Sequence, residues 1–208
     1  AWSLPPGDAN CQFALHQTTI TGNCLPVIVT SSTFSFTQLV ASEPPDGHVL
    51  AAHNEDWVPE DENDVYVVLA HPKDEPPFLA MTYGGLLPNV GFNAYGIAQL
   101  IDSVYPNDSR IGIPRLVVAR AVLASRRLSG ALGRTLISHR AAGYNHILAD
   151  DHGELYSVEV SARKFDILHG TDGYMAHTNH YLSHAMKEVE SDPEELISSR
   201  VRYFRADR

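Results

Sequence analysis

Cysteine and long hydrophobic runs are both scarce in this chain of 208 residues. The two cysteines, Cys11 and Cys24, are too few for a disulfide framework or for a structural zinc site. No apolar run approaches the roughly 20 residues that a membrane-spanning helix needs. The N-terminal segment has no basic stretch followed by a long apolar core, so the sequence predicts no secretory signal. We therefore expect a soluble protein with no membrane partner. The sequence leaves the compartment open and favours the inside of the cell over secretion.

Basic residues are also in the minority. The formal net charge of −10 argues against a nucleic-acid partner, because such proteins need a basic face to displace phosphate counterions. Ten acids lie between Glu43 and Glu75, whereas seven arginines and no acid lie between Arg110 and Arg140. Solvated surface is the simpler interpretation of both segments. The alternative is that the arginine-rich segment contacts an anionic substrate group such as a carboxylate or phosphate.

A glycine-rich phosphate motif and the strand–helix alternation of a Rossmann fold are absent from the sequence. The first half is instead rich in predicted strands. Residues 36–41 and 48–53 predict a hairpin about a turn at 44–47, where Pro presets φ and Gly accepts positive φ. Further strands are predicted at 65–70, at 78–83 and on both sides of a turn within 89–101.

Helices are predicted only after this strand-rich half. Pro114 suits the first residue of a helix, and apolar residues follow it at helical spacing. Ser129 predicts the cap of a second helix to about residue 138. Strands follow at 145–149, 155–160, 164–169 and 174–177, and then Ser191 or Asp192 predicts the cap of a C-terminal helix. This order predicts an α+β fold of two antiparallel sheets packed face to face, with helices outside.

Polar residues gather at the ends of the predicted strands, where a rigid scaffold presents catalytic groups. An Asn side chain donates two hydrogen bonds without carrying charge, so it can stabilise the oxyanion that forms during acyl transfer. The simpler alternative for each Asn is a bond to its own backbone in a turn. Four clusters stand out: Asn54-Glu55-Asp56, Gly91-Phe92-Asn93, Tyr144-Asn145-His146 and His177-Thr178-Asn179-His180.

The two histidines of the last cluster do not predict a metal site. On a strand, His177 and His180 point to opposite faces, and no third ligand follows at a suitable spacing. We expect neither a metal nor a cofactor.

Four segments taken together resemble one enzyme family: DGHVLAAHNEDW, VGFNAYGIA, YNHILADDHGELYSVE and MAHTNHY. Their order and spacing are similar to the acyl-coenzyme A:6-aminopenicillanic acid acyltransferase family, the C45 peptidase-like branch of the N-terminal nucleophile hydrolases. The resemblance covers roughly residues 36–205. It implies a four-layer αββα sandwich, incomplete at both ends in this chain. Residues 1–35 then form an atypical N-terminal segment, and residues 36–208 form a partial acyltransferase- or hydrolase-like domain.

The resemblance also implies a reaction and a site. In this family a precursor cuts itself before a Cys, whose thiol attacks the carbonyl of a small amide, a peptide or an acyl-coenzyme A thioester, and the self-cleaved fragments stay paired. The new α-amine of that Cys acts as the general base. Carried over by position, Asn179 corresponds to the oxyanion-stabilising side chain, and Asp56 with Asn54 to polar support near the nucleophile. Asn93 and Asn145 correspond to positions that shape the substrate site.

The nucleophile position departs from the family pattern. Where the family has Cys-Thr followed by alternating apolar residues, this chain has FTQLVA, so Phe36 stands at the Cys position and Thr37 at the Thr position. A Phe side chain cannot act as a nucleophile. Two hypotheses remain open. The chain is either a hydrolase or acyltransferase of C–N bonds in which Thr37 or Ser35 supplies the nucleophile, or a catalytically inactive member that binds a ligand or has no function.

Overall fold

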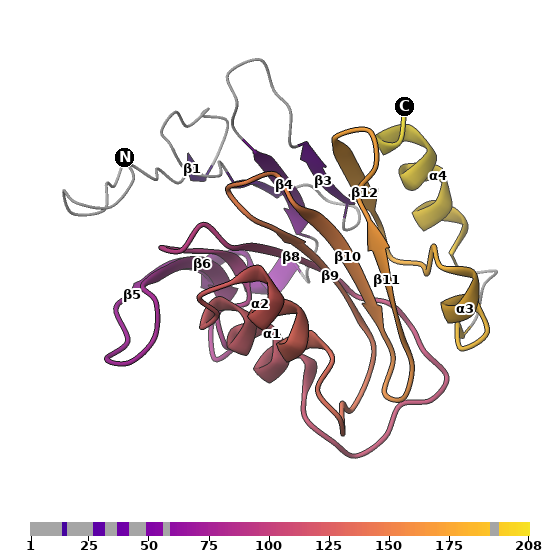
Figure 1. Cartoon of the computed structure of the whole chain (residues 1–208), viewed down its shortest axis with the longest axis horizontal. Coiled ribbons are helices and arrows are strands. Elements are labelled where there is room, and N and C mark those ends of the chain that lie inside the picture. Colours follow the sequence, from indigo (N-terminus) through magenta and orange to yellow (C-terminus); the bar gives the residue numbers. More distant parts are fainter. Residues whose placement is uncertain (1–13, 16–26, 32–36, 42–48, 56–58, 192–195) are drawn as a thin grey trace.

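Two β-sheets stacked face to face form the centre of the molecule (Figure 1). The computed structural model describes residues 14–15, 27–31, 37–41, 49–55, 59–191 and 196–208. Strands β3 (Thr37–Ala41) and β4 (Leu50–Glu55) of one sheet contact β8 (Ala98–Asp102) of the other, and β12 (Tyr174–His177) contacts β10 (Leu155–Val160). The α+β class predicted from the sequence is confirmed.

The first sheet has the strand order β1-β2-β4-β3-β12. In the predicted hairpin, β3 and β4 pair antiparallel with Thr37 opposite Asn54, and the predicted turn at 44–47 lies outside the described residues. However, β2 runs parallel to β4, so the expectation of purely antiparallel sheets is wrong here. Since β3 occupies one side of β4, β2 pairs on the other side. The bounds are β1 (Ala14–Leu15), β2 (Val27–Ser31), β3 (Thr37–Ala41), β4 (Leu50–Glu55) and β12 (Tyr174–His177).

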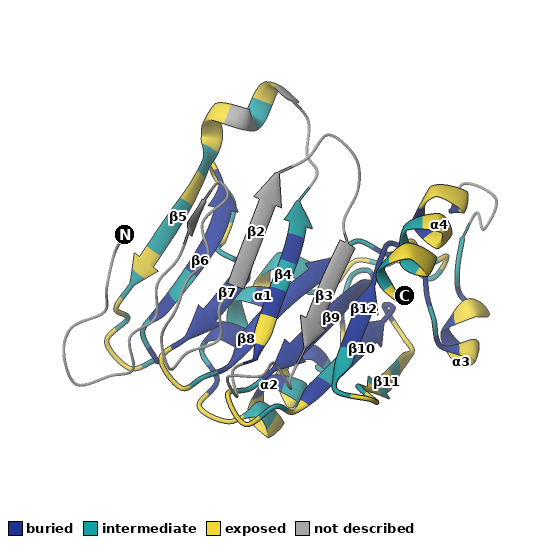
Figure 2. Cartoon of the chain, turned by 90° about the horizontal axis from the view of Figure 1, so that it is seen from above, coloured by how far each residue is buried: buried dark blue, intermediate teal, exposed yellow. Residues whose placement is uncertain are grey.

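The second sheet is antiparallel throughout, in the order β11-β10-β9-β8-β7-β6-β5. Where the sequence analysis predicted both ends of a strand in this sheet, the structure confirms them to within one residue. Figure 2 shows the central strands as almost continuously buried, because the other sheet covers one face and helices cover the other. The bounds are β5 (Val65–Ala70), β6 (Phe78–Tyr83), β7 (Val90–Asn93), β8 (Ala98–Asp102), β9 (Tyr144–Ala149), β10 (Leu155–Val160) and β11 (Phe165–His169), after a 3₁₀ helix at Pro59–Asp64.

Helices α1 (Arg115–Leu123) and α2 (Leu128–Thr135) cover the outer face of the second sheet. The two faces of β8 show this arrangement, because Gln99 bonds the Ala119 carbonyl of α1 while Asp102 bonds His177 of the first sheet. Helix α4 (Ile197–Ala206) packs against β3 and β12. The short helix α3 (His184–Lys187) was not predicted. Within the described ranges, no helix combines the length and apolar character that crossing a bilayer requires.

Both predicted helix caps are wrong. Helix α2 begins at Leu128 with Arg127 in the cap position, so Ser129 lies inside the helix. Helix α4 has Leu196 in the cap position. The Ser191 hydroxyl is instead 2.6 Å from the Tyr105 carbonyl oxygen, to which it donates, and Asp192 lies outside the described residues. The Ser191 side chain, which the local pattern predicts as a helix cap, therefore bonds a distant loop instead.

Gly91 of β7 supplies a test of how closely the sheet is packed. A Cβ at this position would lie 2.1 Å from the carbonyl oxygen of Leu79 and 2.6 Å from the Cα of Ala80, both backbone atoms of β6. We expect Gly91→Ala to lower the free energy of unfolding by about 2–3 kcal/mol, because the clash cannot be relieved by a side-chain rotation. Gly133→Ala is the matched control in α2, where nothing lies within 4 Å. Equal melting temperatures for both variants would contradict this packing.

Candidate active site

Polar residues from both sheets gather at one end of the molecule. Thr37, the first residue of β3, pairs with Asn54 near the end of β4. On its other side, β3 pairs with β12, where Gln38 lies opposite His177. The segment after His177 carries Asn179, so the chain brings Asn179 to the same end as Thr37 and Asn54. Three of the residues predicted for the site therefore share this end of the sheet.

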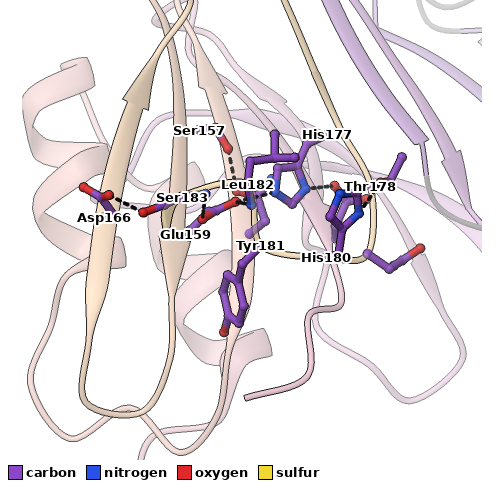
Figure 3. Close-up of polar contacts among 12 residues, drawn as sticks. Ser157, Glu159, Asp166, His177, Thr178, His180, Tyr181, Leu182 and Ser183 are labelled. Atoms are coloured by element: carbon purple, nitrogen blue, oxygen red, sulfur yellow. Dashed lines mark hydrogen bonds and ion pairs between the residues drawn. The ribbon is translucent and has the colours of Figure 1, made fainter. Parts of the chain in front are cut away.

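His177 is the centre of a buried ionic cluster (Figure 3). Its Nδ1 lies 2.8 Å from Oδ2 of Asp102, and its Nε2 lies 2.9 Å from Oε1 of Glu159. Burial alone would lower the pKa of His177, but hydrogen bonds and charge from Asp102 and Glu159 outweigh burial and raise it to about 9. At neutral pH His177 is therefore an imidazolium that joins the two sheets through two carboxylates.

Glu159 also fixes the loop that follows His177. Its Oε1 accepts a hydrogen bond from the Leu182 backbone N–H at 2.6 Å, and its Oε2 accepts one from the Ser183 N–H at 3.0 Å. The Ser183 hydroxyl in turn bonds Asp166 of β11, as Figure 3 shows. A single carboxylate on β10 therefore holds both His177 and the far side of the loop that carries Asn179.

Asn179 is buried and held from two directions. Its Nδ2 donates to the Ser103 carbonyl at 3.0 Å, and its Oδ1 accepts from Nη2 of Arg202 on α4 at 3.0 Å. Among the contacts of the described residues, the second amide hydrogen of Asn179 has no acceptor. The guanidinium on Oδ1 polarises the amide, which strengthens its N–H as a donor. This geometry suits an oxyanion-stabilising group.

The residues on either side of Asn179 are attached to α4. The Thr178 hydroxyl donates to the Ser199 carbonyl at 3.0 Å, and the Ser199 hydroxyl lies 2.8 Å from Nδ1 of His180. Burial, followed by the positive charge of His177, lowers the pKa of His180 to about 4. His180 is therefore neutral at pH 7, and the Ser199 hydroxyl donates to Oγ1 of Thr178 at 3.0 Å. Helix α4 thus fixes the backbone on both sides of the Asn179 amide.

Asn145 lies in a buried row between the two carboxylates of the cluster. It pairs with Asp102 on β8 and with Glu159 on β10. Its Oδ1 accepts the Ser157 hydroxyl at 2.7 Å. Nδ2 of Asn145 and Oδ1 of Asp102 are buried without a hydrogen-bond partner in the part of the chain that the structure describes. The structure thus places Asn145 beside the ionic cluster, on the strand between Asp102 and Glu159.

Asn93 lies at the opposite end of the second sheet from Asp102. Its Nδ2 donates to the Leu123 and Ser125 carbonyls at 3.0 and 2.7 Å, where α1 ends. Its Oδ1 accepts from the backbone N–H groups of Tyr95 and Ile97 in the β7–β8 turn. The structure does not bring Asn93 together with Asn179.

Three residues on which the sequence hypothesis depends lie outside the described residues: Ser35, Phe36 and Asp56. Asp56 directly follows Glu55, the last residue of β4. The structure therefore gives the backbone position of Thr37 alone, and the roles of all these residues stay predictions.

A cavity of about 50 Å³ lies beside the site. Ser103, whose carbonyl holds Asn179, lines it, and so does Glu55, the last residue of β4. Oε2 of Glu55 is 2.5 Å from Nε2 of His53. The remaining wall is mainly aromatic and aliphatic, with Tyr83, Leu86, Ile101 and Tyr144.

The fold is similar to those of solved hydrolases. It is similar to the Caenorhabditis elegans N-acylethanolamine-hydrolyzing acid amidase ortholog, with a TM-score of 0.56 and 13% identity over 79% of this chain and 76% of that chain. It is also similar to a mutant of conjugated bile acid hydrolase from Clostridium perfringens. In that case the TM-score is 0.53 and the identity 15%, over 72% of this chain and 54% of that chain. These likenesses define the class of fold.

The family follows from the sequence match. The family model described as acyl-coenzyme A:6-aminopenicillanic acid acyl-transferase matches residues 42–206. The chain belongs to this family, which confirms the resemblance inferred from the four sequence segments. The matched region begins just after β3, so it includes neither Phe36 nor Thr37.

Proposed function

We propose that this chain is an amide (C–N) bond hydrolase or acyltransferase with the αββα arrangement, in which Thr37 is the N-terminal nucleophile. Family membership supports the reaction class. The observation that carries the assignment of residues is the Asn179 amide, held by Ser103 and Arg202 with a hydrogen to donate. It lies on the segment that passes the start of β3, where Thr37 pairs with Asn54.

Activation consists of hydrolysis of the Phe36–Thr37 peptide bond. One water is consumed, Phe36 gains a carboxylate and Thr37 gains a free α-amine. The resulting fragments stay paired, since β2 of the N-terminal fragment hydrogen-bonds β4 of the C-terminal fragment. The new α-amine has an ordinary pKa of about 7.7–8.0, which suits a general base near neutral pH.

Catalysis then follows a covalent route. The Thr37 hydroxyl oxygen bonds the carbonyl carbon of a small amide or acyl thioester, and the α-amine takes the hydroxyl proton. The carbonyl oxygen becomes negative and accepts a hydrogen bond from Asn179. The amine or thiol leaves with the proton, and water or an acceptor amine then releases the acyl group from Thr37. Asp56 and Asn54 orient the nucleophile.

Two further positions shape the site without taking part in the chemistry. Asn145 lies opposite Asp102 and Glu159 on the neighbouring strands, whose carboxylates hold His177. Asn93 acts from a distance, through the turn that it fixes between β7 and β8.

Ligand binding without catalysis is the second candidate function. Phe36 stands where the family has its Cys, which favours a member that kept the pocket and lost the nucleophile. Such a protein would remain one chain and would not turn over amides or thioesters.

Mass spectrometry of the intact protein, together with an amidase and thioesterase assay, separates these functions. We expect fragments that end at Phe36 and begin at Thr37, with hydrolysis of an amide or acyl thioester. Thr37→Ala should remove the activity by at least about 10³-fold, because the nucleophile is lost. Thr171→Ala is a control at an exposed position that does not line the cavity beside the site.

An uncut chain that hydrolyses neither substrate would overturn the enzyme assignment and favour the ligand-binding function. Phe36→Cys tests whether position 36, and not position 37, is the nucleophile position. If this variant cuts itself before residue 36 and gains activity, Phe36 occupies the nucleophile position and the assignment to Thr37 is wrong. If Phe36→Cys gains nothing, the assignment to Thr37 is supported.

A further inference from the structure

Six of the seven arginines between Arg110 and Arg140 either hold loops together, bond a neighbouring side chain or face solvent. Arg140 is buried and donates to the Ser161, Ile137 and Lys164 carbonyls, and Arg110 donates to the Arg140 and Ala162 carbonyls. These contacts tie loops together. Arg120 is paired with Glu75 at 2.7 Å and Arg126 bonds the Tyr95 hydroxyl, while Arg127 and Arg134 are exposed. Structural or solvated roles account for these six.

Arg115 instead lines the cavity beside the candidate active site. It is half-buried, and the central carbon of its guanidinium lies 4.4 Å from the centroid of the Tyr144 ring. Among the described residues, no carboxylate lies within ion-pair distance of Arg115. Its guanidinium thus stacks on an aromatic face and has hydrogens available for an anion.

The other walls of the cavity restrict which anions fit. Ile101 and Leu116 are apolar, so they suit a short hydrocarbon stretch. Glu55 on the same wall repels a bare anion and accepts a hydrogen bond from a neutral or cationic donor. The volume of about 50 Å³ is a few times the 10–15 Å³ that one water needs, so it holds a small group only. A fitting group therefore carries both a carboxylate and a nearby N–H donor.

We propose that this cavity binds the carboxylate-bearing part of a small N-acyl amino acid, with its carboxylate on Arg115 and its amide N–H toward Glu55. This inference rests on the proposed function, because it names the substrate class for the same site. The cavity reaches Asn179 through Ser103, whose carbonyl accepts the Asn179 amide, so a group held there lies beside the proposed oxyanion donor.

Equilibrium binding measured by calorimetry tests this inference without requiring turnover. N-hexanoylglycine and N-hexanoylethanolamine share one acyl group and differ at the end, which is a carboxylate in the first and a neutral hydroxymethyl in the second. We expect wild-type protein to bind the glycine compound about tenfold or more tightly than the ethanolamine compound, because a charge-assisted bond to Arg115 forms with the first alone. Arg115→Gln should remove that preference.

Two variants serve as controls. Arg134→Gln, at an exposed position of the same segment, should retain the preference, and Arg115→Lys should retain part of it, since it keeps the charge without the planar fork. Equal affinities in wild-type protein, or a preference that survives Arg115→Gln, would overturn the inference. Selective binding without hydrolysis would uphold it while contradicting the proposed catalysis. Hydrolysis of both compounds with no carboxylate preference would support the proposed catalysis and overturn the inference about Arg115.

Discussion

His177→Gln is expected to lower the free energy of unfolding by about 3–5 kcal/mol, because it leaves Asp102 and Glu159 as buried carboxylates without their shared cation. Urea titration followed by circular dichroism measures the change. His184→Gln, at an exposed position, is the matched control and should lie within about 0.5 kcal/mol of wild type.

The pH dependence of unfolding distinguishes the ionic role of His177 from simple packing. Its pKa of about 9 in the folded protein lies above the ordinary value of 6.5, so its contribution to stability is fully present below pH 6.5. That contribution is lost as the pH rises from 6.5 through 9. Wild-type protein should therefore lose stability across this range more steeply than His177→Gln. Parallel pH profiles for the two proteins would show that His177 is not charged in the fold.

Asn179→Ala is expected to reduce kcat by about 10²–10³-fold, since it removes an oxyanion donor from the proposed reaction. The change should affect kcat far more than KM, because the oxyanion forms in the transition state. Asn63→Ala, at an exposed position, serves as the control.

A structural role for Asn179 alone would give a different result. Loss of the Ser103 and Arg202 contacts would lower the melting temperature without a selective effect on kcat. An Asn179→Ala protein with wild-type kcat would exclude Asn179 from catalysis.

Local sequence patterns predicted most of the strands but not their long-range partners. Alternation and turn chemistry located the β3–β4 hairpin, because both depend on neighbouring residues. The parallel pairing of β2 with β4 joins two segments that β3 separates in the sequence, and no local pattern encodes it. The cap predicted at Ser191 failed for the same reason, since the loop at Tyr105 takes its hydroxyl.

The candidate site could also be predicted only in part from the sequence. The sequence segments led to Asn54, Asn145 and Asn179 through family resemblance. The ionic cluster was missed, because His177 is separated from Asp102 by 75 residues and from Glu159 by 18. A signal was present in the sequence, since each acid ends or nearly ends an apolar strand, as in AQLID and LYSVEV. A buried acid in such a position requires a partner, and only the fold shows that the partner is His177.

Trapping of the acyl-enzyme tests the central claim most directly. Wild-type protein would be mixed with a short acyl thioester, quenched in acid, digested and analysed by tandem mass spectrometry. The proposed mechanism predicts an acyl ester on a peptide whose N-terminal residue is Thr37, absent from Thr37→Ala. An acyl group on another residue, or none on a chain that remains uncut, would contradict the assignment of Thr37 as the nucleophile.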